Sequence, residues 1–102
     1  MAKHILEVAP KSAKVIFEND VVRVIMTTMK KGQSIPLHSH NKGFSYSLNS
    51  GKIRIKTEAG KSFVASVRKG DAEWAESDGK GETHAVDNLG GVLRELYVEF
   101  KG

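Results

Sequence analysis

The feature that most constrains the fold is a period-two alternation of apolar and polar residues, which recurs in several short segments. Successive side chains of a β-strand point to opposite faces, so this alternation is typical of half-buried strands. The clearest case is Ile53–Glu58, where two isoleucines alternate with arginine and lysine. The same pattern predicts further strands at Val21–Met29, Phe44–Leu48, Ser62–Val67 and Arg94–Phe100.

Short turn signals separate these segments, and no window of ten or more residues has a convincing helical period. The turn signals are rich in glycine and small polar residues, as in Asn49–Lys52, Glu58–Lys61, Lys69–Asp71 and Leu89–Gly91. Many short strands joined by regular turns indicate an all-β sandwich or barrel. The 102 residues suit one domain. We predict a single domain over 1–102, with an N-terminal arm at 1–20 and a barrel core at 21–100.

Composition excludes several classes of protein. The chain is 39% hydrophobic and 27% charged, which is ordinary for a globular domain and argues against disorder. It has no cysteine, so disulfides, thiolate metal ligands and cysteine nucleophiles are excluded. Its formal net charge of +4 comes from scattered lysines and arginines, which predict a solvated surface rather than a nucleic-acid interface. No segment has the pattern of a signal peptide or a membrane span, and we expect a cytoplasmic protein.

The histidines are the main candidates for chemistry. His38 and His40 are separated by one residue, so on a strand their side chains point the same way, with Cα atoms about 6.5 Å apart. Two imidazoles at that spacing can bind one cation at about 2.0–2.1 Å. The spacing also fits two surface histidines at a strand end. His4 has no neighbouring histidine, and we expect it at the surface.

The residues around these histidines resemble the two sequence motifs of the cupin superfamily. In the first motif, five residues separate Gly32 from His38, and Gly51 closes the motif. In the second, a strand led by glycine precedes His84, and Asn88 follows four residues later. The resemblance implies a small jelly-roll barrel, closed or nearly closed, of about eight to ten strands.

The resemblance extends over about 21–100 and also implies a site and an assembly. His38, His40 and His84 match the family's metal ligands, and the implied cofactor is a divalent ion of Fe, Mn, Ni or Zn. Members of the family are commonly dimers, and a dimer would also cover exposed strand edges. We therefore expect a homodimer that binds a small-molecule ligand or substrate, with no nucleic-acid or membrane partner.

Two positions depart from the family pattern. Phe44 occupies the position of the family's glutamate ligand, so the ligand set is reduced to three histidines. Three neutral imidazoles leave a divalent ion its full charge and open positions, but they bind it less tightly, and a vestigial site remains an alternative. Glu76 occupies the position of a proline. If Ala72 and Trp74 face inward, Glu76 does too, as an extra ligand or an acid/base; it could equally be solvated, and Glu82 is a weaker candidate.

The sequence also suggests residues around the site. Phe44, Tyr46, Leu48 and Trp74 are expected to line the interior, with Leu48 serving only as core packing. The hydroxyl of Tyr46 could point into the pocket, since a buried tyrosine usually finds a polar partner. Asn88 is expected to fix the backbone through hydrogen bonds rather than to touch a ligand.

Two functions remain open, because a fold does not determine a function. The first is a metal-dependent enzyme acting on a small organic molecule, of dioxygenase, isomerase or lyase type. The second is a non-catalytic module that holds a small ligand, with a weak or vestigial metal site. An enzyme needs a positioned proton-transfer group or a redox metal with open positions. The sequence offers only Glu76 and Tyr46 as proton-transfer groups.

Overall fold

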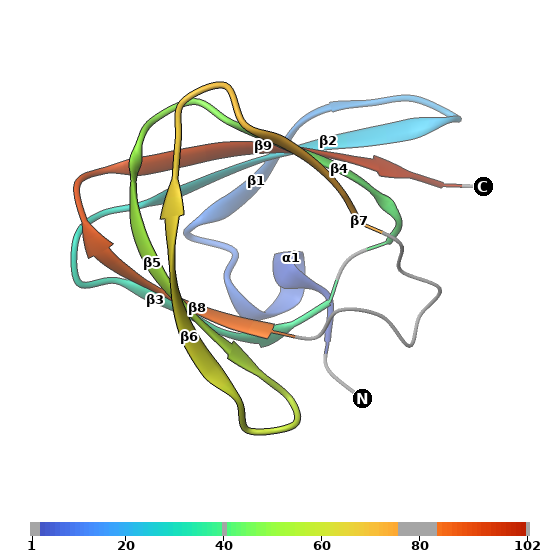
Figure 1. The fold of residues 1–102 in the computed structure, drawn as a ribbon. Coiled ribbons are helices and arrows are strands. Elements are labelled where there is room, and N and C mark those ends of the chain that lie inside the picture. The colour runs from blue at the N-terminus through green and yellow to red at the C-terminus, as the bar shows by residue number, and fades with distance from the viewer. Residues whose placement is uncertain (1–2, 40, 76–83, 102) are drawn as a thin grey trace.

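The computed structural model describes residues 3–39, 41–75 and 84–101, and in them the chain folds into two antiparallel β-sheets that face each other (Figure 1). The elements are α1 (Ile5–Val8), β1 (Ala13–Glu18), β2 (Val22–Met29), β3 (Ser34–His38), β4 (Gly43–Ser47), β5 (Gly51–Thr57), β6 (Ser62–Val67), β7 (Ala72–Ala75), β8 (His84–Gly90) and β9 (Leu93–Phe100). The all-β jelly-roll prediction is confirmed. No helix in the described residues is long and apolar enough to cross a membrane.

The two sheets are built from strands that are distant in sequence. The five-stranded sheet has the order β1-β2-β9-β4-β7, and the four-stranded sheet has the order β3-β8-β5-β6. Within the described residues no strand pairing joins one sheet to the other, so the structure is a sandwich-like jelly roll rather than a closed ring of strands. The predicted turns at Gly60 and Gly70 are present, with φ of +89° and +90°, a backbone conformation that glycine adopts without strain.

The five-stranded sheet has its more apolar face on the outside, which the alternation pattern alone did not indicate. Residues directly opposite one another in neighbouring strands share a face, and the pairs of β2, β9, β4 and β7 extend one apolar row across the sheet. The outer residues, half-buried or exposed, are Phe17, Val22, Val24, Met26, Phe44, Tyr46, Trp74, Leu96, Val98 and Phe100. The inner face of the same strands is more polar.

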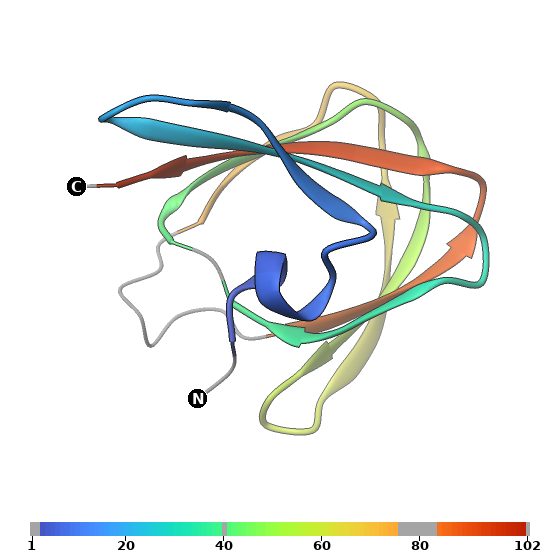
Figure 2. The ribbon, with the colours of Figure 1, turned by 180° about the vertical axis from the view of Figure 1, so that it is seen from behind.

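The core lies between the sheets and is closed at one end by the N-terminal segment. Ile25, Met29 and Tyr97 from the five-stranded sheet pack with Ile35 and with Ile5 of α1. Figure 2 shows α1 across the end of the space between the sheets. The position of α1 is fixed by main-chain hydrogen bonds to the residue that follows His38, from Ile5 N to Ser39 O and from Ser39 N to Lys3 O.

His4 is not the surface residue that the sequence suggests. Its Nδ1 accepts a hydrogen bond from Leu6 N, 3.1 Å away, at the start of α1. Its Nε2 therefore carries the proton and donates to Oε1 of Glu99, 2.7 Å away. Glu99 is fully buried, also accepts from Asn41 N at 3.2 Å, and lies 3.7 Å from the Arg23 guanidinium. The histidine thus attaches the N-terminal segment to the last strand.

Asn88 has the structural role that the sequence predicts. It is 2% exposed, and its Nδ2 donates to Met29 O at 2.9 Å and to Gly91 O at 2.8 Å. Its Oδ1 accepts from Gly90 N at 2.9 Å. One side chain thereby satisfies three main-chain groups where β2, β8 and the turn before β9 meet, which holds the two sheets in register at that corner.

Candidate functional site

A cavity of about 750 Å³ lies between the two sheets. The four-stranded sheet lines it largely with apolar side chains, including Ile53, Ile55, Phe63 and Val86. The five-stranded sheet lines it with smaller or polar side chains, including Thr27, Ser45, Ser47, Glu73 and Glu95. A volume of this size is in the range of small-molecule sites, and the mixture of an apolar wall with a few polar groups is typical of them.

His38 reaches this cavity because β3 contains a β-bulge. Ile35 pairs with Val86 and His38 pairs with His84, so two residues of β3 lie opposite a single residue of β8. The extra residue shifts the in–out alternation of side chains by one position. Ile35 and His38 therefore both face inward, although they are three positions apart. The bulge includes Pro36, which has no N–H to lose from the sheet.

The ring of His38 is held in one tautomer. Its Nδ1 lies 2.9 Å from the carbonyl oxygen of Pro36, which can only accept, so Nδ1 carries the proton. Burial lowers the pKa of His38 to about 4, because the ring is only 2% exposed and its charged form would lose its hydration; the hydrogen bond to Pro36 opposes this shift. At neutral pH the imidazole is therefore uncharged, and Nε2 is the unprotonated nitrogen. A second-sphere carbonyl on one nitrogen is the usual arrangement for a metal-binding histidine.

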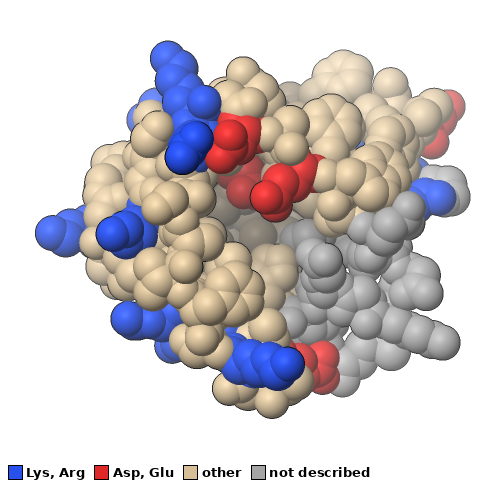
Figure 3. Space-filling model, viewed as in Figure 1, with Lys and Arg blue, Asp and Glu red and all other residues tan. Residues whose placement is uncertain are grey.

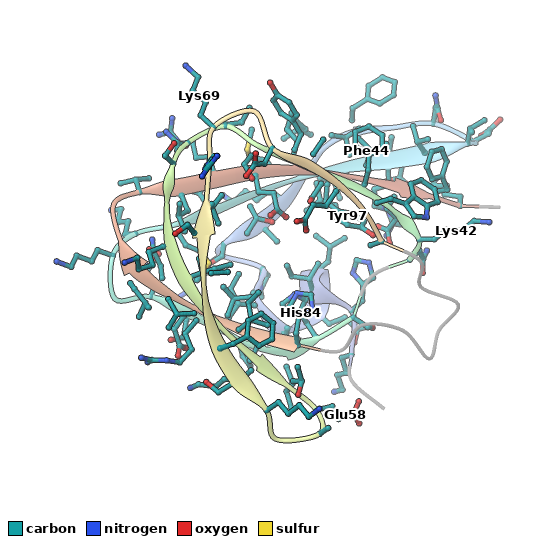
Figure 4. All side chains as sticks on the ribbon, in the orientation of Figure 1. Lys42, Phe44, Glu58, Lys69, His84 and Tyr97 are labelled. Carbon is teal, nitrogen blue, oxygen red and sulfur yellow. The ribbon has the colours of Figure 1, made fainter. Side chains whose placement is uncertain are left out.

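His84 lies directly opposite His38. The two ring centroids are 4.6 Å apart with an angle of 72° between the planes, and His84 points into the space between the sheets (Figure 4). Two neighbouring imidazoles, one with a fixed tautomer, fit the preference of a divalent ion such as Zn²⁺ or Ni²⁺ for nitrogen ligands. The third predicted ligand, His40, lies outside the described residues. Within residues 3–39, 41–75 and 84–101, no three His, Asp or Glu side chains form a metal-binding group.

Phe44 and Tyr46 do not line the cavity, and this part of the sequence prediction is wrong. They are 37% and 40% exposed and lie on the outer face of the five-stranded sheet, and Figure 4 shows Phe44 pointing away from the interior. The inward positions of β4 belong instead to Ser45 and Ser47. Strand β4 thus has its small residues toward the cavity and its aromatic residues on the outside, the reverse of the predicted orientation. A carboxylate at position 44 would therefore not face His38 and His84.

The predicted facing of β7 is reversed in the same way. Trp74 contributes to the cavity edge, but it is 54% exposed and its ring lies 5.8 Å from that of Phe100 on the outer side. Glu73 and Ala75, expected to face outward, line the cavity. Glu76 and Glu82, the candidate acid/base groups, lie outside the described residues.

Sequence reasoning missed two carboxylates of the cavity wall, Glu73 of β7 and Glu95 of β9. Burial, together with the negative charge of Glu73, raises the pKa of Glu95 to about 7. The alternation of β9 places Glu95 on the face opposite to Leu96 and Val98, but alternation alone does not tell which of the two faces lines the interior. A carboxyl group with a pKa near neutrality inside a cavity is suited to proton transfer or to binding a cation.

Comparison with known proteins identifies the fold. No protein-family model matches the sequence, and no curated protein matches it. Among solved structures, a cupin domain from Bordetella pertussis Tohama I is similar, with a TM-score of 0.76 and 18% identity over 88% of this chain and 92% of that one. A cupin superfamily protein from Desulfitobacterium hafniense has a TM-score of 0.63 and 13% identity, covering 88% of this chain and 76% of that one.

A third solved structure shows the same fold and covers more of the chain than the first two. A cupin-2 domain containing protein from Shewanella frigidimarina has a TM-score of 0.60 and 12% identity, covering 99% of this chain and 85% of that one. At these identities the likeness concerns the arrangement of the strands, and two facing antiparallel sheets with a cavity between them are that arrangement. The chain therefore has the fold of the small cupin-domain proteins.

Proposed function

We propose that this protein binds a small organic molecule in its central cavity, beside a divalent metal ion held by His38, His40 and His84. The observation that carries the proposal is the pairing of His38 with His84, which puts two imidazole rings 4.6 Å apart inside a cavity. The sequence supplies the third ligand through the spacing of His38 and His40. The cavity supplies room for a ligand next to the metal.

The candidate cofactor is Fe, Mn, Ni or Zn in the divalent state. An ion held by three neutral histidines would keep its positive charge and open positions, and would act as a Lewis acid on a bound ligand. The protein's own contribution would be positional. Ile53, Ile55 and Phe63 would exclude water from one side of the ligand, and Glu95 would exchange a proton on the other. Such a set suits an isomerase, lyase or dioxygenase acting on a small organic molecule.

A non-catalytic ligand-binding module is the second candidate. It is favoured by the continuous apolar wall of the four-stranded sheet, which needs no metal to hold a small molecule. The two candidates differ in metal occupancy. A resident catalytic ion predicts one ion per chain, whereas a vestigial site predicts less than stoichiometric binding.

Removing His84 should abolish stoichiometric metal binding, because one of three nitrogen ligands is lost. The measurement is a titration of untagged, chelator-treated protein with Mn²⁺, Ni²⁺ and Zn²⁺, in which the parent should bind one ion per chain. His38→Ala and His40→Ala should behave like His84→Ala. His4→Ala is the matched control, since it removes a histidine that bonds to Glu99, and it should keep the metal affinity while losing thermal stability. Unchanged affinity in His84→Ala would refute the proposed site.

We also propose that the outer face of the five-stranded sheet packs against the same face of a second copy. Five strands about 4.8 Å apart and four to eight residues long make a face of roughly 500 Å², which is more than half of the ~800 Å² per partner of a standard interface. The apolar outer row is flanked on the same face by Lys14, which lies opposite Met26 on the edge strand β1. A long lysine side chain at a sheet edge can extend into solvent, so two apolar rows can still meet, although each chain carries a net charge of +4.

Phe44→Glu is the variant that tests this interface. Phe44 lies opposite both Val98 and Trp74 in the apolar row, so a carboxylate there would be buried without a partner in the dimer. We expect sedimentation at micromolar concentration to give twice the 11.2 kDa monomer mass for the parent and 11.2 kDa for the variant. Val64→Glu is the control, because Val64 is 52% exposed on the other sheet. A monomeric parent would contradict the proposal.

A further inference from the structure

We infer that the cavity selects organic cations, and that Glu73 and Glu95 bind the charged end of a small amine whose apolar body lies against the opposite sheet. The inference deepens the proposed function, since it rests on the cavity being a small-molecule site. It concerns the wall formed by the five-stranded sheet, and because a divalent ion at the histidines would oppose a second cation, it is tested on chelator-treated protein. Three observations carry it: the charge of the lining, the state of Glu95 and the character of the opposite wall.

The charged residues that line the cavity are mostly acidic, whereas the whole chain has a net positive charge. The whole chain has sixteen Lys and Arg against twelve Asp and Glu. The described lining of the cavity instead has four acidic side chains, Glu58, Asp71, Glu73 and Glu95, against one basic side chain, Arg94. Figure 3 shows acidic side chains gathered along one edge of the hollow, with lysines and arginines on the surrounding surface. A cavity of one sign attracts ligands of the opposite sign and repels like-charged ones.

Glu95 is a half-buried acid on the cavity wall, and it makes no hydrogen bond or ion pair among the described residues. It projects from the inner face of β9, between Ser47 of β4 and Thr27 of β2 in the register of the sheet. An ionised carboxylate that is partly removed from water is less favourable without a positive partner. Burial and the charge of Glu73 accordingly raise its pKa to about 7. A bound ammonium group would supply the missing partner.

The apolar wall formed by the four-stranded sheet determines which kind of ligand body fits the cavity. Ile53, Ile55, Phe63 and Val86 face the cavity from the four-stranded sheet. They would contact a short aliphatic or aromatic body, and this burial would add to the affinity in proportion to the apolar area. Within the described residues no three acidic or histidine side chains gather at the Glu73–Glu95 wall to hold a metal ion, so an organic cation suits this wall better than a hard divalent ion.

The test compares three probes of equal chain length by isothermal titration calorimetry at pH 7.5: hexylammonium, hexan-1-ol and hexanoate. We expect hexylammonium to bind the parent at least about tenfold more tightly than hexan-1-ol, because a charge-assisted contact with a partly desolvated carboxylate is strong. Hexanoate should bind most weakly. Glu95→Gln and Glu73→Gln should each reduce the affinity for hexylammonium and leave that for hexan-1-ol unchanged. Glu7→Gln, an exposed position on α1, should change neither.

The pH dependence separates Glu95 from the other titratable groups around the cavity. Those groups are Glu73 and Asp71 near β7, Glu58 at the end of β5, Arg94 on β9, and His38 and His84 on the opposite sheet. Binding of hexylammonium should strengthen between pH 6 and pH 8, since Glu95 must lose a proton to pair with it. The difference between the parent and Glu95→Gln isolates that proton from those of the other groups.

The outcomes distinguish this inference from the proposed function. Equal affinity for the three probes, or tighter binding of hexanoate, would overturn cation selection and leave the cavity as a small-molecule site. Failure of all three probes to bind would count against the small-molecule site itself. Displacement of hexylammonium by Mn²⁺ in the His84→Ala variant would show that the acidic wall is a metal site, which would also overturn the inference.

Discussion

Replacement of Glu99 by Ala is expected to lower the free energy of unfolding by about 3–5 kcal/mol, the usual cost of breaking a buried ion pair on one side. Glu99 is fully buried and accepts hydrogen bonds from His4 and Asn41 N, with Arg23 3.7 Å away. Without its carboxylate, the buried part of Arg23 and the ring of His4 lose their acceptor. The N-terminal segment also loses its side-chain attachment to β9.

Urea denaturation of the parent and of Glu99→Ala measures this loss. For a chain of this length, a loss of 3 kcal/mol corresponds to a fall of about 15 °C in the melting temperature. Glu7→Ala, at an exposed position whose main-chain N–H bonds to His4 O in either variant, should change the stability by less than about 0.5 kcal/mol. A Glu99→Ala protein within 1 kcal/mol of the parent would show that the buried network is not a structural attachment.

Acidification is expected to remove about 3 kcal/mol of stability through His38 alone. Its pKa in the folded protein, about 4, lies below its ordinary value of 6.5, because burial disfavours the charged ring. Between pH 6.5 and pH 4 the unfolded chain therefore binds a proton that the folded chain does not. The stabilisation is fully present above pH 6.5, decreases as the pH falls to 4, and changes no further below that.

The prediction is tested by unfolding chelator-treated protein at pH 7.5 and pH 4.5, with His38→Gln as the comparison. The variant cannot titrate at this position, so its loss of stability should be smaller than that of the parent by most of the 3 kcal/mol. Glu99 also contributes acid sensitivity. Burial would raise its pKa, but the hydrogen bonds of His4 and Asn41 N, with the charge of Arg23, hold the pKa below its usual range. That contribution is common to both proteins and cancels in the difference. Equal losses in the two proteins would contradict the assignment to His38.

The strands could be predicted from the sequence because alternation is a local property. Every segment with a clear period of two is a strand, and Ser62–Val67 has the predicted bounds. His38 was a candidate through its spacing from His40, and His84 was a candidate through the resemblance to the cupin motifs. What alternation cannot tell is which of the two faces points to the core, since a single strand shows only that the faces differ.

The facing of β4 and β7 was misjudged because the five-stranded sheet turns its more polar face to the cavity and its more apolar face outward. The assumption that the most apolar side is the inner side fails when the inside is a polar cavity and the outside is an apolar face. Gly43 carries a local sign of this arrangement. A Cβ at Gly43 would lie 1.9 Å from the carbonyl oxygen of Val98, so β4 approaches β9 too closely for any larger residue at that inward position.

Two further features depend on contacts that no local pattern contains. The bulge at Pro36 shifts the in–out alternation of side chains along β3, and only the pairing of β3 with β8 reveals it. The bond between His4 and Glu99 joins residues 95 positions apart. A lone histidine near the N-terminus gives no indication of such a partner, so its structural role could not be predicted from the sequence.

The most direct test of the central claim, that the cavity beside His38 and His84 is the functional site, is a crystal grown with Mn²⁺ and measured for anomalous scattering. The account predicts one strong peak per chain inside the cavity. The peak should lie within about 2.0–2.2 Å of two atoms, Nε2 of His38 and a ring nitrogen of His84. A peak only on the outer surface would contradict the account. So would a cavity filled by other electron density with no anomalous peak near either imidazole ring.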